Sequence, residues 1–342
     1  MIRTKTTFIV GAGASCELQM PGGEELLARV AGGLDHSRYG TELQTRDSIL
    51  IARYLGKMAE RTGNGAGPLH VAADRIRIAS RMGRSIDTVI DQNDTDQYVG
   101  QCGKLAIVHF ICQAEAKSTL RLAPRVDGDL PIQGTDNWLV HLGQLITSGV
   151  PRSKLESCFD NVSIISFNYD RSIEHFMPFA LMMSHGLPMK DAQRIVAQKL
   201  KVYHPYGNIG RLPWQTGEAS DVEWGTDQPW NILNLTGQIR TYAEAMRDTE
   251  GLRSMRASVV GAKRLVFLGF GFHPQNVDLL IDYPLSHEPE LLMTLHEMSE
   301  ANKKSVIRMM RRKTAVERDD LFMTSKGKSY EMMRDYSLLL ES

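Results

Sequence analysis

The sequence predicts an α/β fold: a Rossmann-like, mostly parallel sheet with a helical insertion and a C-terminal helical extension. Short β-branched or apolar segments recur along the chain, and segments with helical spacing lie between them. Strands that alternate with helices form a largely parallel sheet covered on both faces. Ligands of such sheets bind beyond the carboxyl ends of the strands. The segments that directly follow the strands are therefore the candidate functional segments.

The first predicted strand is Thr6–Val10, which runs into a glycine-rich turn and then a helix from about residue 23 to residue 30. From about residue 43 to residue 148 the apolar spacing is mostly helical, with a glycine-rich break at 63–68, and we interpret this stretch as a helical insertion. Further strands are predicted at residues 162–167, Lys201–Tyr203, Ile232–Leu235 and Arg264–Leu268. Residues 289–342 are rich in charge and predict a helical extension beyond a domain of residues 1–288.

Composition excludes several classes of protein. The 342 residues include 42% hydrophobic ones, enough for a sizeable core, and 40 basic residues balance 40 acidic ones. The basic run at 303–313 is typical of a solvated helix face, so we expect no strong independent nucleic-acid binding. No apolar stretch approaches the roughly 20 residues of a membrane helix, and no secretory signal is recognisable, which predicts a soluble, cytoplasmic protein.

The four cysteines argue against a metal centre. Cys16, Cys102, Cys112 and Cys158 form no C-x-x-C pair, so neither a structural zinc cluster nor a disulfide framework is expected. Small buried thiols in a reducing compartment are the simplest interpretation. We expect no metal.

The turn Gly11-Ala12-Gly13-Ala14-Ser15 is the first candidate ligand site. Glycines let the backbone turn tightly after the strand and approach a phosphate, although a plain strand-to-helix turn has the same pattern. The dinucleotide fingerprint of dehydrogenases has a third glycine where Cys16 stands. A hydride-transferring dehydrogenase is therefore disfavoured.

The second candidate is Ser166-Phe167-Asn168-Tyr169-Asp170, at the end of the next predicted strand. An amide and a carboxylate at this place can hold ribose hydroxyls, a water molecule or a carboxamide. Asn and Asp also commonly cap a following helix, so this segment alone leaves both interpretations open.

Two further segments follow strands. His204 stands beside a strand end in Val202-Tyr203-His204-Pro205-Tyr206-Gly207, and its ordinary pKa near neutrality suits a general base. The loop Gly269-Phe270-Gly271-Phe272-His273-Pro274-Gln275-Asn276 again lacks side chains where a ligand could approach the backbone, although a helix entry with a capping residue is the alternative.

These segments, together with Ser85-Ile86-Asp87 in the helical insertion, resemble the motifs of the sirtuin-like NADase family of bacterial anti-phage defence and occur in the same order. The resemblance spans residues 6 to about 280. It implies that Gly11, Ala12, Gly13 and Ser15 cradle the NAD phosphates and that Asn168 is essential for cleavage. It also implies that Asp170 faces the nicotinamide carboxamide, and that Gly269, Gly271 and Asn276 border the adenosine.

The sequence departs from true sirtuins at three places. Their catalytic histidine directly precedes a glycine, whereas here Tyr206 precedes Gly207 and His204 stands two residues earlier; we count Tyr206 among the NAD contacts and leave open whether His204, Tyr206 or neither is the base. The paired C-x-x-C module of the deacetylases is missing. Their Pro-Asp-Phe-Arg loop is replaced by Met20-Pro21-Gly22-Gly23. Protein deacetylation is therefore not expected.

The resemblance implies an NAD hydrolase that cleaves the nicotinamide–ribose bond to give nicotinamide and ADP-ribose, and that depletes NAD during defence. NAD would be the substrate. A non-catalytic sensor of NAD or ADP-ribose, as a subunit of a defence complex, is the alternative. Similar proteins act with a HerA-type translocase ATPase, with an Argonaute-like protein or alone. The helical insertion favours a homo-oligomer, since self-association would bury its apolar faces.

Overall fold

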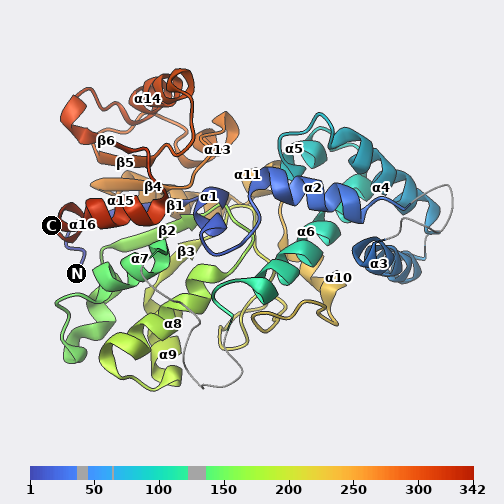
Figure 1. The fold of residues 1–342 in the computed structure, drawn as a ribbon, viewed down its shortest axis with the longest axis horizontal. Coiled ribbons are helices and arrows are strands. Elements are labelled where there is room, and N and C mark those ends of the chain that lie inside the picture. Colours follow the sequence, from blue (N-terminus) through green and yellow to red (C-terminus); the bar gives the residue numbers. More distant parts are fainter. Residues whose placement is uncertain (37–44, 64, 122–135) are drawn as a thin grey trace.

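The computed structural model describes residues 1–36, 45–63, 65–121 and 136–342. In this part of the chain, six parallel strands form one sheet in the order β3-β2-β1-β4-β5-β6 (Figure 1). The strands are β1 (Thr6–Val10), β2 (Val162–Ser166), β3 (Lys201–Tyr203), β4 (Arg264–Leu268), β5 (Glu290–Thr294) and β6 (Phe322–Ser325). The predicted Rossmann-like α/β fold is confirmed.

The strand order reverses at the centre of the sheet. From β1 the chain proceeds to β2 and β3 on one side and then returns to β4 on the other side of β1. Val10 is level with Ser166 of β2 and Leu268 of β4, so these three strands end together. A crevice for ligands is expected at such a point.

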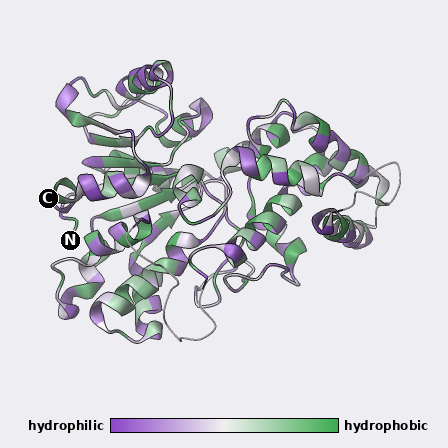
Figure 2. Ribbon diagram, viewed as in Figure 1, coloured by the Kyte–Doolittle hydropathy of each residue, from purple (hydrophilic) through white to green (hydrophobic). Residues whose placement is uncertain are grey.

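Both faces of the sheet are covered (Figure 1), which explains why the central strands β1 and β4 are buried along their whole length, as Figure 2 shows them largely hydrophobic. Phe8 and Val10 pack towards one face with α7 (Trp138–Thr147), α8 (Ser172–His185), α9 (Met189–Lys199) and α15 (Ser329–Asp335). Ile9, between them, packs towards the opposite face with α12 (Thr249–Val260), α13 (Pro274–Leu280) and α14 (Glu300–Thr314). The two cores are separated by the sheet.

A helical lobe lies beside the sheet and corresponds to the predicted insertion (Figure 1, right). It consists of α2 (Gly23–Gly33), α3 (Arg46–Thr62), α4 (Gly67–Ala79), α5 (Ile86–Asp91) and α6 (Gln97–Lys117). The lobe starts earlier than expected, since α2 packs against α6, and α7 already belongs to the sheet layers. Residues 43, 44, 64 and 122–135 of the predicted insertion lie outside the described residues.

The remaining helical segments are short. They are α1 (Ala12–Cys16), η2 (Arg152–Phe159), α10 (Ile232–Leu235), η3 (Thr236–Gln238), α11 (Tyr242–Arg247), η4 (Asp319–Leu321) and α16 (Ser337–Glu341). Among the described residues, no helix has both the length and the apolar character that crossing a membrane requires.

The prediction of a strand at Ile232–Leu235 is wrong, because this segment forms the short helix α10. Ile232 and Leu235 are buried, and Leu233 between them is only half-buried. A separation of three positions places two side chains on one face of a helix, and in four residues this spacing is difficult to distinguish from alternation.

The C-terminal region is also not only helical. Residues 289–342 include β5 and β6, which extend the sheet from β4, so a boundary after residue 288 would pass through the sheet. Leu291, Leu292 and Met293 are buried, and Glu290 forms an ion pair with Arg264 of β4 at 2.6 Å. The apolar segment is only a few residues long and is flanked by charged residues, which concealed the strand signal.

Candidate active site

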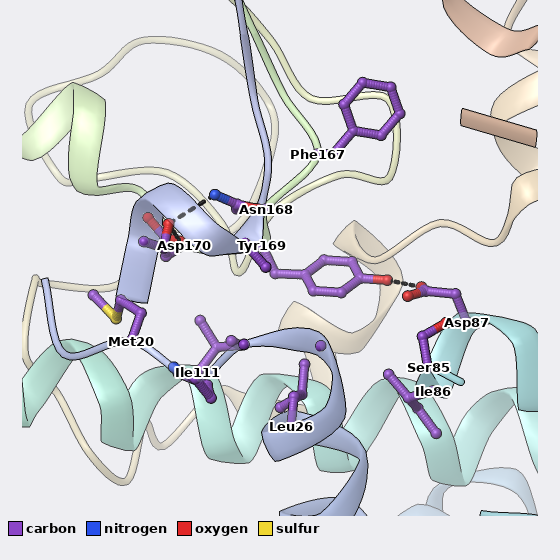
Figure 3. A pocket seen from close by; sticks show the side chains of 15 residues that line it. Met20, Leu26, Ser85, Ile86, Asp87, Ile111, Phe167, Asn168, Tyr169 and Asp170 are labelled. Carbon is purple, nitrogen blue, oxygen red and sulfur yellow. Dashed lines mark hydrogen bonds between the residues drawn. The ribbon is translucent and has the colours of Figure 1, made fainter. Parts of the chain in front are cut away.

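A pocket lies at the carboxyl ends of β1 and β2, where the helical lobe meets the sheet (Figure 3). The turn after β1, the start of α2, the start of α5 and the segment after β2 surround it. The lining residues are Ala12, Ser15, Met20, Pro21, Gly22, Gly23, Leu26, Ser85, Ile86, Asp87, Ile111, Phe167, Asn168, Tyr169 and Asp170. Ala12, Ser15, Asn168 and Asp170 thus lie together, as the sequence predicts.

Asn168 is buried and is held by the glycine turn. Its side-chain Nδ2 donates hydrogen bonds to the carbonyl oxygen of Gly11 at 3.1 Å and to Ser15 Oγ at 2.7 Å. Both amide hydrogens are used in this way. The acceptor Oδ1 has no hydrogen bond to a described residue, so a ligand could donate a hydrogen bond to this atom.

Asp170 lines the pocket and also contacts the first residue of the next helix. Its Oδ2 accepts a hydrogen bond from Ser15 Oγ at 2.9 Å, and its Oδ1 accepts one from the backbone N–H of Ser172 at 3.0 Å. The second bond helps to start α8. Ser15 therefore joins Asn168 and Asp170 in one chain of hydrogen bonds, which fixes both side chains at the pocket.

The glycines pack two turns against each other. Gly13 N–H donates to the carbonyl oxygen of Gly269 at 3.0 Å, and Gly11 N–H donates to Leu268 O at 2.9 Å. A Cβ atom on Gly11 would lie 2.6 Å from Gly269 O, and one on Gly269 would overlap the amide nitrogen of Ala14. The N–H groups of Gly11 and Gly13 are thus engaged within the protein. The glycines bring the ends of β1 and β4 together, a role that the phosphate interpretation did not include.

Replacing Gly269 with alanine should destabilise the fold by about 3 kcal/mol, because its φ of +56° is strained for any other residue and the new methyl group meets backbone. Gly271→Ala is the matched control. A Cβ on Gly271 has no atom within 4 Å, so that change should cost less than about 1 kcal/mol. Urea denaturation of both variants checks the difference, and equal stabilities would contradict this account of the turn.

His204 lies behind Asn168 and does not line the pocket. Its Nε2 is 2.8 Å from Glu174 Oε1, and its Nδ1 is 3.2 Å from the backbone oxygen of Asn168. Burial alone would lower the pKa of His204, but the Glu174 carboxylate and these hydrogen bonds raise it. With both ring nitrogens engaged, His204 has no free nitrogen for a substrate. The geometry supports a structural role for His204 over that of a general base, one of the alternatives that the sequence left open.

The pair His204–Glu174 should make stability depend on pH. The folded-state pKa of His204 is raised and that of Glu174 is lowered, relative to ordinary values of 6.5 and 4.5. The contribution of the pair is therefore complete between these two values and is lost as the pH rises through the raised pKa of His204. His204→Gln should flatten the fall in unfolding free energy above about pH 6.5, while exposed His296→Gln should not. Denaturation at several pH values tests this, and parallel curves for all three proteins would refute it.

Tyr206 and Asn276 lie together outside the pocket. The Tyr206 hydroxyl donates to Asn276 Oδ1 at 2.6 Å, and its ring packs edge-on against Phe167 with centroids 5.7 Å apart. Gly271 also lies outside it. The predicted site residues thus form two groups: one around Asn168 at the pocket, and one beside the end of β4.

Tyr169 and Asp87 tie the helical lobe to the site, a contact that sequence reasoning did not assign. The Tyr169 hydroxyl donates to Asp87 Oδ1 across the pocket (Figure 3). Burial raises the pKa of Asp87, and burial together with Asp87 raises the pKa of Asp91 to about 6. The segment that contains Ser85 and Asp87 stood out in the sequence, but the sequence could not identify Tyr169 as the partner of Asp87.

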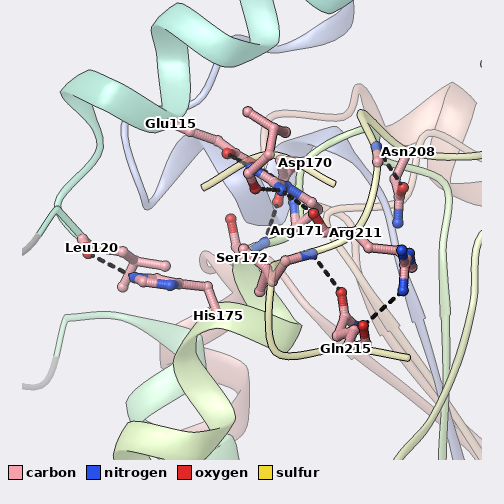
Figure 4. A network of polar contacts seen from close by, with 12 residues as sticks. Glu115, Leu120, Asp170, Arg171, Ser172, His175, Asn208, Arg211 and Gln215 are labelled. Atoms are coloured by element: carbon pink, nitrogen blue, oxygen red, sulfur yellow. Dashed lines mark hydrogen bonds and ion pairs between the residues drawn. The ribbon is translucent and has the colours of Figure 1, made fainter. Parts of the chain in front are cut away.

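Glu115 and Arg171 form a buried ion pair that sequence reasoning missed (Figure 4). Arg171 Nη2 is 2.5 Å from Glu115 Oε2, and both side chains are 1% exposed. The guanidinium Nη1 also donates to the carbonyl oxygens of Arg211 and Val222. Because Arg171 follows Asp170 directly, this pair anchors the backbone of the site. The sequence feature that could have indicated this pair is Glu115 itself, a carboxylate near the end of the apolar helix α6.

Comparisons with known proteins do not identify the chain. No model of a known protein family matches it, and no curated protein is significantly similar to it. Within the described residues, no group of three or more His, Cys, Asp or Glu side chains could hold a metal ion. The function of the protein must therefore be inferred from the sequence motifs and from the geometry of the pocket.

Proposed function

We propose that this protein hydrolyses NAD at the nicotinamide–ribose bond and releases nicotinamide and ADP-ribose. One observation carries the proposal: Asn168 and Asp170 share Ser15 in one hydrogen-bonded chain, at a pocket beyond the carboxyl ends of β1 and β2, next to the β1–β4 position where the strand order reverses. Ligands of doubly wound sheets bind beyond the carboxyl ends of the strands. The order of the motifs, which resembles that of sirtuin-like NADases, supports the same substrate.

The chemistry requires few groups. As the bond between the anomeric carbon and nicotinamide breaks, its electron pair neutralises the pyridinium nitrogen, so the leaving group needs no acid. A water oxygen bonds to the anomeric carbon and loses one proton to solvent. Asn168 Oδ1 can accept a hydrogen bond from this water or from a ribose hydroxyl, and the Asp170 carboxylate can stabilise the developing cation. His204 has no part in these steps.

Access to the pocket requires movement. Its cavity has a volume of about 80 Å³, whereas sites for larger ligands typically occupy about 300 to 1,000 Å³. NAD would therefore enter only when the start of α2 and the start of α5 move away from the end of β2. Such a closed state suits an enzyme whose activity would deplete NAD, since the activity must be held off until a trigger arrives.

A non-catalytic sensor of NAD or ADP-ribose is the second candidate. It is favoured by the absence of a histidine from the described residues that line the pocket. Incubating the purified protein with NAD, with and without candidate partners, separates the two functions. Release of nicotinamide supports the hydrolase, and saturable binding without release supports the sensor. Reduction of the nicotinamide ring after addition of a hydride-donating substrate would reveal a dehydrogenase.

For the biological role we propose anti-phage defence, with a HerA-type ATPase or an Argonaute-like protein as a candidate partner. Self-association is part of the proposal. Val71, Ile78 and Met82 in the helical lobe are 58%, 52% and 91% exposed, which supports burial against another chain. We expect light scattering at micromolar concentration to give a mass above that of the monomer. A strict monomer, with and without partner, would contradict this.

A further inference from the structure

A second cavity, of about 630 Å³, lies between α8, α9 and the segment 211–224. This volume is within the range of small-molecule sites. α8 contributes one continuous helical face to its wall, at positions 175, 178, 179 and 182. We call this cavity the α8 groove. It shares no lining residue with the pocket at Asn168.

The walls of the α8 groove are aromatic. The rings of His175 and Trp224 stack with centroids 4.2 Å apart and an interplanar angle of 3°. Phe179 meets His175 edge-on, and Trp214 also lines the groove. Phe179 and Leu212 are 8% and 2% exposed, so the floor is buried and apolar. Flat faces of this kind favour a planar ring as the ligand.

One residue that lines the groove, Trp224, has a buried polar atom without a partner among the described residues. Trp224 Nε1 is buried and donates no hydrogen bond to any residue in the described part of the chain. Most buried N–H groups are paired, so an acceptor on a ligand would satisfy this one. The side chains of Gln193 and Glu223 add an amide and a carboxylate.

The described lining of the groove offers no positive charge that would attract an anion. Its described lining contains no lysine or arginine, and Glu223 contributes a negative charge. Burial lowers the pKa of His175 to about 3, so its imidazole is neutral, and it is bonded through Nε2 to Leu120 O at 3.2 Å (Figure 4). Arg171 lies 6.0 Å from the centre of the Trp224 ring, but its charge is paired with Glu115. An uncharged ligand fits this environment better than a phosphorylated one.

We propose that the α8 groove binds an uncharged, planar heteroaromatic ring with a hydrogen-bond acceptor, the chemistry of a nucleoside. The ring packs against the aromatic walls, Trp224 N–H donates to a ring nitrogen or carbonyl, and Glu223 accepts from an exocyclic amine. The site does not depend on the proposed hydrolysis of NAD. It is connected to the pocket through Arg171, which contacts Trp224 and directly follows Asp170.

The test is calorimetric titration of the full chain with adenosine, guanosine and cytidine, each compared with its 5′-monophosphate. At least one nucleoside should bind saturably at millimolar or lower concentration, and its monophosphate should bind at least about tenfold more weakly. Failure of all three nucleosides, or equal binding of the monophosphates, would overturn the proposal.

Variants locate the binding. Gln193→Trp should fill the α8 groove and abolish binding, and Trp224→Phe, which keeps a ring but removes the donor, should weaken it by about three- to tenfold. Trp230→Phe is the matched control, because Trp230 is 93% exposed and lies outside the groove. Binding that survives in folded Gln193→Trp and Trp224→Phe belongs to another site and refutes the proposal. Nicotinamide release, if present, should be unchanged in Gln193→Trp, so the two proposals fail separately.

Discussion

Replacing Asn168 with alanine is expected to reduce nicotinamide release by about 100- to 1,000-fold, the usual cost of removing a positioned polar group at a reacting centre. The structure gives the reason for this position. Two hydrogen bonds, to Gly11 O and Ser15 Oγ, hold the amide so that Oδ1 is available at the pocket. Alanine removes that acceptor. The rate of nicotinamide release at saturating NAD measures the effect.

Stability and NAD binding should change much less in Asn168→Ala. The variant loses two hydrogen bonds, each worth about 1 kcal/mol in net stability, and calorimetry should still detect NAD. Asn302→Ala is a matched control, since Asn302 is an exposed asparagine on α14, far along the chain from the site. A folded Asn168→Ala protein that cleaves NAD at the parental rate would refute the proposed mechanism.

Much of the sheet could be predicted because its central strands are short apolar runs that end in unusual residues. β1, β2 and β4 each lead into a segment that contains glycine or Asn and Asp, and their carboxyl ends meet at one edge. This was sufficient to place Ala12, Ser15, Asn168 and Asp170 together. β5 and β6 escaped detection because they lie within a strongly charged region.

The orientation of individual side chains could not be predicted, because it depends on partners distant in the sequence. His204 follows a strand end, as a base should, but Glu174 on α8 binds one ring nitrogen and the backbone of Asn168 the other. Only the packing of α8 against the sheet reveals this. The glycine turn is a similar case, since its closest neighbour, Gly269, lies 256 positions after Gly13.

The second large effect is expected for Glu115→Ala, which should destabilise the protein by about 3 to 5 kcal/mol. Removing the carboxylate leaves the Arg171 guanidinium buried and uncompensated. Arg171 cannot turn outward without cost, because its Nη1 also donates to Arg211 O and Val222 O, at 3.0 and 2.6 Å. Glu156→Ala is the matched control: Glu156 pairs with Arg194 at a similar distance of 3.0 Å, but both side chains are about half exposed.

Exposed pairs of this kind contribute at most about 1 kcal/mol, so Glu156→Ala should unfold at nearly the parental urea concentration while Glu115→Ala unfolds far below it. Glu115→Gln should fall between them, since it keeps the size of the side chain and one acceptor oxygen, but loses the charge and replaces the second acceptor by an amide donor. Because Arg171 adjoins Asp170, nicotinamide release should decrease in Glu115→Gln even where the protein remains folded. Equal stabilities of the Glu115→Ala and Glu156→Ala proteins would mean that the buried pair does not anchor this segment.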